Sequence, residues 1–171
     1  ANKALLANHG TALARLAETA NATLRFEAAV AGGIPIVKAL REGLAGNRIS
    51  AVHGILNGTC NYILTAMQEG VCTGKPREFA DVLAEAQRLG YAEADPTMDV
   101  DGHDAAHKLA ILTSVAFGCP VDLAAVHVEA FPQLCATAID YALTLGYRSE
   151  RPCTSRAGAD GVLQRVHPCM V

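Results

Sequence analysis

The spacing of apolar residues along the chain predicts several helices separated by short strands. The clearest helix is predicted over residues 77–89, where apolar side chains recur at the intervals of one helical face until Gly90. A second, mostly apolar helix is predicted over residues 104–117, and we expect it to be central and buried. Further helices are predicted over residues 3–20, from Pro35 to about Gly46, from Thr59 as a candidate N-cap to about Gly70, and over 134–145.

Strands are predicted between these helices. The pattern indicates strands at residues 23–30, 48–56 and 161–166, and residues 123–130 are expected to be extended. Helices interspersed with short strands favour an α+β (α/β-like) fold, in which a mixed β-sheet is covered by helices. The order of the elements does not fix the sheet topology.

Composition limits the classes of protein to consider. The 171 residues are 51% hydrophobic and 18% charged, which suits one folded domain with its own core. A formal net charge of −3 and a pI near 6.1 provide no basic surface for nucleic acid. No apolar run reaches the ~18 residues of a membrane helix, and the first residues lack the apolar core of a secretory signal. We therefore expect a cytoplasmic protein with small-molecule or protein partners, and neither nucleic acid nor membrane.

The cysteines and the two ends of the chain add two expectations. Six cysteines occur without a C-x-x-C pair, so scattered reduced thiols are favoured over a zinc or disulfide framework. The first residue is Ala rather than Met and the last residues are apolar, so we expect a piece cut at both ends.

The segment 90–108 is the strongest candidate for a site, because it combines five carboxylates with a lysine. Its first part is punctuated by Gly90, Pro96 and Gly102 and is predicted to be a loop. Asp104 and Lys108 follow at the start of the next helix, where a spacing of four places them on one face. A partly desolvated lysine among carboxylates can relay a proton to a carbonyl oxygen. An exposed ion pair, worth only about 0.3–0.5 kcal/mol, remains the alternative.

A zinc site is a second alternative for the same segment. His103 and His107 have the H-x-x-x-H spacing of a helical metal site, with Asp104 where H-E-x-x-H has its glutamate. The shorter acid, Gly102 directly before the motif and the lack of an evident third ligand argue against a zinc hydrolase.

The pattern from Ala86 through Gly90, Asp95-Pro96, Asp99, Gly102, Asp104 and Lys108 resembles the signature segment of homoserine dehydrogenases. The resemblance implies roles for its residues. Lys108 would be the acid/base, Glu93 and Asp104 would hold the amino-acid substrate, and Asp99 would line the same pocket. Gly90 would lie at the cofactor.

Three further segments carry the resemblance. Phe26–Ile36, read from its residues as a strand and a Gly-Gly turn, resembles the loop that binds a monovalent cation, usually sodium. The ligands would be the carbonyls of Glu27, Val30, Gly32 and Ile34. Ala1-Asn2-Lys3 implies that Lys3, otherwise a solvated surface lysine, contacts cofactor and substrate as a second catalytic lysine. Gly54–Leu64 implies a structural role, with Cys60 where Thr is usual.

The family implies an NAD- or NADP-dependent interconversion of L-aspartate 4-semialdehyde and L-homoserine, in threonine and methionine biosynthesis, by a homodimer or higher oligomer. Residues 1–25 would be the end of the nucleotide-binding half, and residues 26–171 a catalytic domain truncated at its C-terminus. No G-x-G-x-x-G occurs in the chain, so we expect the chain alone to be inactive. A non-catalytic dimerisation or ligand-binding module remains the alternative.

One segment departs from the family. After Tyr147 the family continues as an apolar strand, whereas this chain has a polar run that includes Pro152. Proline cannot donate to a β-ladder, so a weakened, edge-placed or disordered strand is predicted there rather than a central one.

Overall fold

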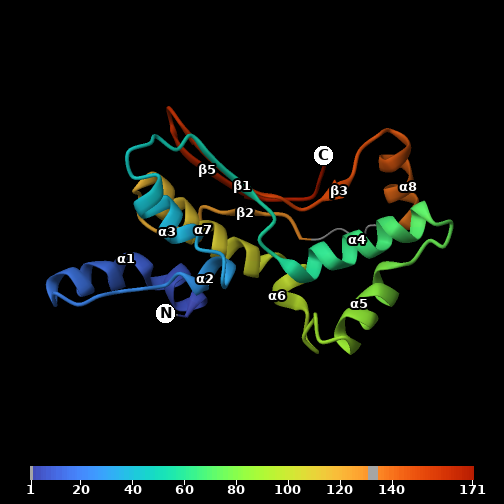
Figure 1. The fold of residues 1–171 in the computed structure, drawn as a ribbon, viewed down its shortest axis with the longest axis horizontal. Coiled ribbons are helices and arrows are strands. Elements are labelled where there is room, and N and C mark those ends of the chain that lie inside the picture. The colour runs from blue at the N-terminus through green and yellow to red at the C-terminus, as the bar shows by residue number, and fades with distance from the viewer. Residues whose placement is uncertain (1, 131–134) are drawn as a thin grey trace. The chain divides into compact units, whose positions relative to one another are not determined.

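The structure, a computed structural model, describes residues 2–130 and 135–171, which form two compact units. Unit 1 comprises Ala1–Leu56, Ala105–His127 and Cys153–Arg165. Unit 2 comprises Asn57–Asp104, Val128–Pro152 and Val166–Val171. Helices make up most of the chain, and short strands pair in two sheets, so the predicted α+β class is confirmed (Figure 1).

Helices from four parts of the sequence build the core of unit 1. They are α1 (Lys3–Thr19), α2 (Ala28–Ala31), α3 (Ile36–Lys38), which continues as the π-helical turn η1 (Ala39–Gly43), and α7 (His103–Phe117), most of which belongs to this unit. The helix α1 begins where the side chain of Asn2 accepts a hydrogen bond from the amide of Leu5. Their apolar faces meet in one cluster of buried residues, namely Leu6, Ala29, Val30, Val37, Ile111 and Leu112. The helices predicted over 3–20 and 104–117 are therefore confirmed.

The predicted strand over residues 23–30 is wrong. Residues 22–26 form no strand, and α2 follows directly. The cause is Glu27, whose carboxylate oxygens accept hydrogen bonds from the backbone amides of Val37 (2.8 Å) and Lys38 (2.9 Å). These two bonds hold residue 27 against the start of α3. The backbone therefore turns at this point and does not continue as a strand.

A four-stranded sheet has the order β1–β4–β5–β2, and most of its residues belong to unit 1. The strands are β1 (Ala51–Gly54), β2 (His127–Val128), β4 (Cys153–Gly158) and β5 (Gly161–Val166). The strands β1 and β4 run antiparallel, with Ala51 opposite Arg156 and Gly54 opposite Cys153. The predicted strands at 48–56 and 161–166 are confirmed, whereas only two residues of the segment 123–130 join a strand.

The prediction for the segment around Pro152 is wrong for its second half. The strand β4 lies between β1 and β5, in the interior of the sheet. Pro152 precedes the first residue of β4, so its missing N–H leaves the ladder intact. The polar side chain of Ser155 is fully buried, because its hydroxyl accepts a 2.9 Å hydrogen bond from that of Thr113 in α7. The hydrogen-bonded hydroxyl of Ser155 thus takes the place of the apolar residue expected in an interior strand.

Unit 2 contains α4 (Gly58–Cys72), α5 (Phe79–Arg88), the single turn α6 (Thr97–Val100) and α8 (Ala136–Thr144). Both α5 and α8 pack against α4 (Figure 1), through the buried residues Ile63, Met67, Val82 and Ile139. The strands β3 (Ser149–Glu150) and β6 (Cys169–Met170) form a separate antiparallel pair. The helix predicted over 77–89 is confirmed, and so is the last helix, although Leu134 lies outside the described residues.

Candidate functional site

Three side chains of unit 2 meet in a buried polar cluster. The Nδ2 atom of Asn57 donates hydrogen bonds to Oδ1 of Asp99 (2.7 Å) and to Oδ2 of Asp104 (3.0 Å). Asn57 and Asp104 are only 6% and 7% exposed. The structure thus brings together two carboxylates that the sequence proposed for substrate binding. Asn57 itself was missed.

Asn57 has a second role that explains its orientation. Its Oδ1 accepts a hydrogen bond from the backbone amide of Cys60 (2.8 Å), which makes Asn57 the N-cap of α4. The predicted cap, Thr59, instead donates its hydroxyl hydrogen to the carbonyl of Tyr91. Because the cap uses the amide oxygen, the amide hydrogens face the carboxylates. The Asn57-Gly58 dipeptide predicted a turn and gave no sign of this bridge.

Arg151 is a buried charge beside the same cluster, with only 4% of its surface exposed. Its guanidinium donates hydrogen bonds to the carbonyl oxygens of Asp99 (3.2 Å), Val100 (2.8 Å) and Glu129 (3.2 Å). It also lies 3.5 Å from the sulfur of Cys60. The sequence shows only an arginine in a polar run before Pro152, and that pattern is typical of an exposed loop.

Cys60 lies between these charges and is fully buried. Burial raises the pKa of its thiol above the ordinary 9.0, against the opposing effect of the Arg151 guanidinium. The carboxylates of Asp99 and Asp104 raise this pKa further. The thiol is therefore protonated at neutral pH and donates to the carbonyl of Asp99 at 3.3 Å. It serves as a neutral donor rather than as a nucleophile.

The remaining acidic residues of the segment are more exposed. Glu93 is exposed, and the backbone beside it is held by Gln87, whose Nε2 donates to the carbonyls of Glu93 (3.0 Å) and Ala94 (3.2 Å). The carboxylate of Asp95 accepts hydrogen bonds from the hydroxyl and the amide of Thr97, and these bonds lower its pKa. Asp95 therefore shapes the turn that starts α6.

Lys108 belongs to unit 1 and is half-buried in α7. Its Nζ donates a 2.7 Å hydrogen bond to the carbonyl of Leu56, the last residue of unit 1 before Asn57. Asp104 is the second residue of the same helix, four residues earlier. Residues at this spacing share one helical face, so the side chains of Asp104 and Lys108 project in similar directions.

The segment proposed to bind a cation forms a tight turn in unit 1. Val30 is buried at the end of α2, Gly32 follows with φ of +59°, and Ile34 is 66% exposed. The carbonyl of Glu27 accepts a hydrogen bond of 3.4 Å from the amide of Val30, and that of Ile34 accepts one of 2.8 Å from the amide of Ile36, while the carboxylate of Glu27 caps α3. Carbonyl oxygens are the ligand atoms that a hard cation prefers, so the groups present in this turn are compatible with a monovalent cation.

Lys3 and Gly90 complete the predicted set. Lys3 is the first residue of α1 and is half-buried, and Ala1 lies outside the described residues. Gly90 follows α5 with φ of +79°, which explains the glycine by backbone conformation.

The zinc alternative receives no support. His107 is 9% exposed whereas His103 is exposed, and no group of three potential metal-binding side chains exists among residues 2–130 and 135–171. All six cysteines lie in the described part of the chain and are free. Within that part, no helix is both long and apolar enough to cross a membrane.

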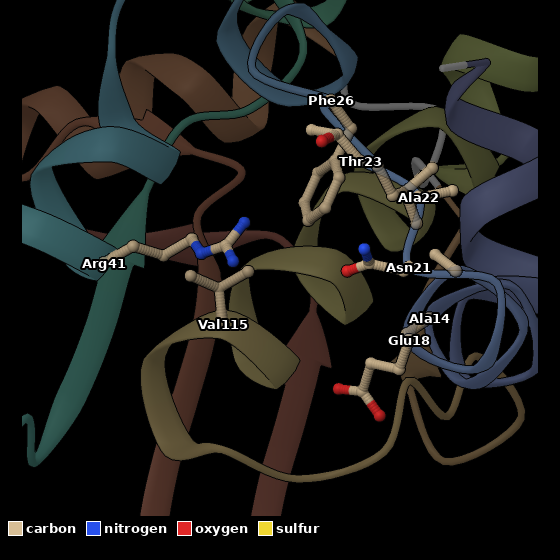
Figure 2. A pocket seen from close by; sticks show the side chains of 10 residues that line it. Ala14, Glu18, Asn21, Ala22, Thr23, Phe26, Arg41 and Val115 are labelled. Carbon is tan, nitrogen blue, oxygen red and sulfur yellow. The ribbon is translucent and has the colours of Figure 1, made fainter.

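Unit 1 also contains a hollow. It has a volume of about 590 Å³ and is lined by the end of α1, residues 21–24, Phe26, Arg41 and Val115. Figure 2 shows the side chains of Phe26, Arg41 and Asn21 facing the same space. None of the residues proposed for substrate, cofactor or cation lines this hollow.

An α+β fold with a buried carboxylate cluster, and with Lys108 one turn after Asp104 on the same helix, suits a domain of an oxidoreductase, and comparison with known proteins identifies the family. The homoserine dehydrogenase family model matches residues 35–171. The chain therefore belongs to the homoserine dehydrogenase family.

Individual relatives agree. Over the whole chain it is 52% identical to the homoserine dehydrogenase of Neisseria gonorrhoeae and 51% identical to that of Pseudomonas aeruginosa, and it spans 38% of the length of each. The solved homoserine dehydrogenase of Thiobacillus denitrificans superposes with a TM-score of 0.93 at 48% identity, over 99% of this chain and 38% of that one. A hyperthermophilic archaeal homoserine dehydrogenase in complex with NADPH superposes with a TM-score of 0.80 at 29% identity, over 99% of this chain and 47% of that one.

Proposed function

We propose that this chain is the catalytic and substrate-binding portion of an enzyme that interconverts L-aspartate 4-semialdehyde and L-homoserine with NAD or NADP. The observation that carries the proposal is the bridged pair Asp99–Asn57–Asp104, followed one helical turn later by the half-buried Lys108. The chain spans 38% of the length of its curated relatives.

In this proposal each side chain has one task. The bound cofactor supplies the hydride chemistry. Asp104 and Glu93 bind the ammonium and hydroxyl groups of the amino acid, with Asp99 in the same pocket, because carboxylates form the stronger, charge-assisted hydrogen bonds with such donors. Lys108 donates a proton to the oxygen that becomes the hydroxyl of homoserine, and takes it back in the reverse direction. Lys3 stabilises negative charge near the cofactor, and Gly90 contributes to cofactor binding.

The hydrogen bond between Lys108 and the carbonyl of Leu56 supports this role. A 2.7 Å contact to a backbone oxygen restricts a long and otherwise mobile side chain. A restrained ammonium donates its remaining hydrogens in defined directions, which is what a general acid requires.

The proposal includes three further properties. A monovalent cation, with sodium as the expected ion, binds the carbonyls of Glu27, Val30, Gly32 and Ile34. The protein acts in the cytoplasm, in the biosynthesis of threonine and methionine, as a homodimer or higher oligomer. Residues 1–25 belong to the nucleotide-binding half, although α1 packs within unit 1.

The test is the oxidation of homoserine by the protein in its natural full length. Lys108→Ala should reduce kcat by about 10²–10⁴-fold with a smaller change in KM, as expected for the loss of an acid/base group. Lys108→Arg should be nearly as slow, because arginine keeps the charge but holds its proton too tightly. Lys75→Ala, which changes an exposed lysine of unit 2, is the control.

Two outcomes would contradict the proposal. Near-normal kcat in Lys108→Ala would remove Lys108 from the mechanism. Homoserine binding without turnover, with either cofactor, would favour the alternative of a non-catalytic ligand-binding module.

A further inference from the structure

Arg151 holds the turn that carries Asp99. It donates to the carbonyl oxygens of Asp99 and Val100, the last two residues of α6, and to that of Glu129 in a separate segment of unit 2. Carbonyls at the end of a helical turn have no intrahelical partner and carry partial negative charge, so a cation is favoured there. One guanidinium thus joins two segments by fixed, directional bonds.

Gly102 provides the space for this contact. Its φ is +89°, and a Cβ at this position would lie 3.0 Å from Cζ of Arg151 and 2.9 Å from Cγ1 of Val128. Its amide donates to the carbonyl of Asp99 at 3.1 Å, so Asp99 receives bonds from both Gly102 and Arg151. Any side chain at position 102 would force the guanidinium out of its place.

Arg151 acts on the carboxylate pair Asp99 and Asp104 through two successive contacts. Arg151 fixes the backbone of Asp99, and the carboxylate of Asp99 shares the amide of Asn57 with Asp104. A displacement of the α6 turn would therefore break the Asn57–Asp99 bond first and leave the amide to Asp104 alone. All four residues belong to unit 2, so this connection lies within one compact unit.

We propose that Arg151 is a positioning residue of the enzyme, which holds Asp99 in the place where Asp99 and Asp104 together receive the substrate. The inference rests on the proposed function for the identity of that substrate. The geometric part, that Arg151 controls the Asn57 bridge, stands on the hydrogen bonds alone.

The experiment uses Arg151→Met and Arg151→Lys in the protein of natural full length, with Arg148→Met as the matched control, since Arg148 is an exposed arginine of the same segment. Arg151→Met should raise the KM for homoserine about tenfold, corresponding to about 1.4 kcal/mol of lost binding, with less than about a threefold change in kcat. Arg151→Lys should recover part of this loss, because it keeps a donor but cannot reach all the acceptors. Arg148→Met should leave both constants unchanged.

A second readout does not depend on activity. In ¹⁵N-resolved NMR spectra, the side-chain amide protons of Asn57 report their bonds to the two carboxylates. Both Arg151 variants should shift the proton directed at Asp99 and speed its exchange with water, and Arg148→Met should not. If Arg151→Met does not fold, Arg151→Lys decides.

Unchanged Asn57 resonances in the folded Arg151 variants would overturn the inference, as would a KM equal to that of Arg148→Met. An unmodified protein that does not oxidise homoserine would refute the proposed function, and the Asn57 spectra would still decide whether Arg151 positions the pair.

Discussion

Replacing Gly102 by alanine tests the packing around Arg151 by stability alone. The added methyl group has two costs. At φ of +89° an L-residue is strained, which costs about 1–2 kcal/mol. The methyl group would also overlap the guanidinium of Arg151, which donates to three backbone carbonyls.

The second cost is the larger one. A hydrogen bond to a charged group contributes about 1.5–3 kcal/mol, and a buried acceptor left without a partner adds to the loss. Partial relaxation of the arginine preserves some of these bonds, so we take about 2–3 kcal/mol for its displacement. The sum is about 3–5 kcal/mol, a large part of the 5–15 kcal/mol that stabilises an ordinary protein.

Gly146→Ala is the matched control. Gly146 also lies in unit 2 and has φ of +83°, but a Cβ there would have no heavy atom within 4 Å. This variant should lose only the backbone contribution of about 1–2 kcal/mol. The urea midpoint of Gly102→Ala should therefore lie about 1 M or more below that of Gly146→Ala, for a denaturant slope of about 2 kcal/mol/M.

A double-mutant cycle sharpens the result. In an Arg151→Ala background, the methyl group at position 102 has no guanidinium to displace, so its cost should fall toward that of Gly146→Ala. The remaining difference is the 2.9 Å approach to Cγ1 of Val128. Equal midpoints for Gly102→Ala and Gly146→Ala in the unmodified background would refute the reasoning, because only backbone strain would then be present.

Three further predictions concern chemistry. Glu93→Gln should raise the KM for homoserine more than it lowers kcat, because a neutral amide pairs poorly with an ammonium. Steady-state kinetics compare it with Glu78→Gln, which changes an exposed residue. Equal KM values in the two variants would contradict the assignment. Activity should respond to sodium or potassium and ignore EDTA, and a zinc content removed by EDTA together with activity would contradict the cation assignment. Burial raises the pKa of Cys60 in the folded state, so its contribution to stability is fully present below pH 9.0 and is lost as the pH rises through the folded pKa. Urea midpoints at pH 8 and 10 should therefore fall less for Cys60→Thr than for the unmodified protein, and an equal fall would contradict the predicted effect.

The helices were predictable because their signal is local. In α5 and α7 the apolar spacing, the terminal glycines and the buried faces agree, so burial follows from residues within one window. The strand predicted over 23–30 failed because Glu27 bonds to amides ten and eleven residues away. The rule applied at Pro152 was sound, but it concerns the residue itself, and β4 begins one position later.

The residues of the candidate site also differ in whether a local pattern could predict them. Asp99, Asp104 and Lys108 could be proposed from one segment, since carboxylates and a lysine at helical spacing are visible without a structure. Asn57 and Arg151 reach Asp99, Val100 and Asp104 across 42 to 52 residues of sequence. No local pattern distinguishes a buried arginine that donates to carbonyls from an exposed one, so this supporting layer was accessible only from the fold.

The placement of Asp104 and Lys108 on α7 gives a physical reason for the order of residues in the segment 90–108. Four residues of α-helix advance about 6 Å, so the separation between the carboxylate proposed to bind substrate and the proposed acid is set by one regular element. Asn57 and Arg151 then have only to place Asp99 against the first turn of that helix, which they do by bonds within unit 2. Asp104 is thus the residue that links the two parts of the proposed mechanism. Its loss should affect both KM and kcat, whereas changes at Arg151 should act mainly on KM.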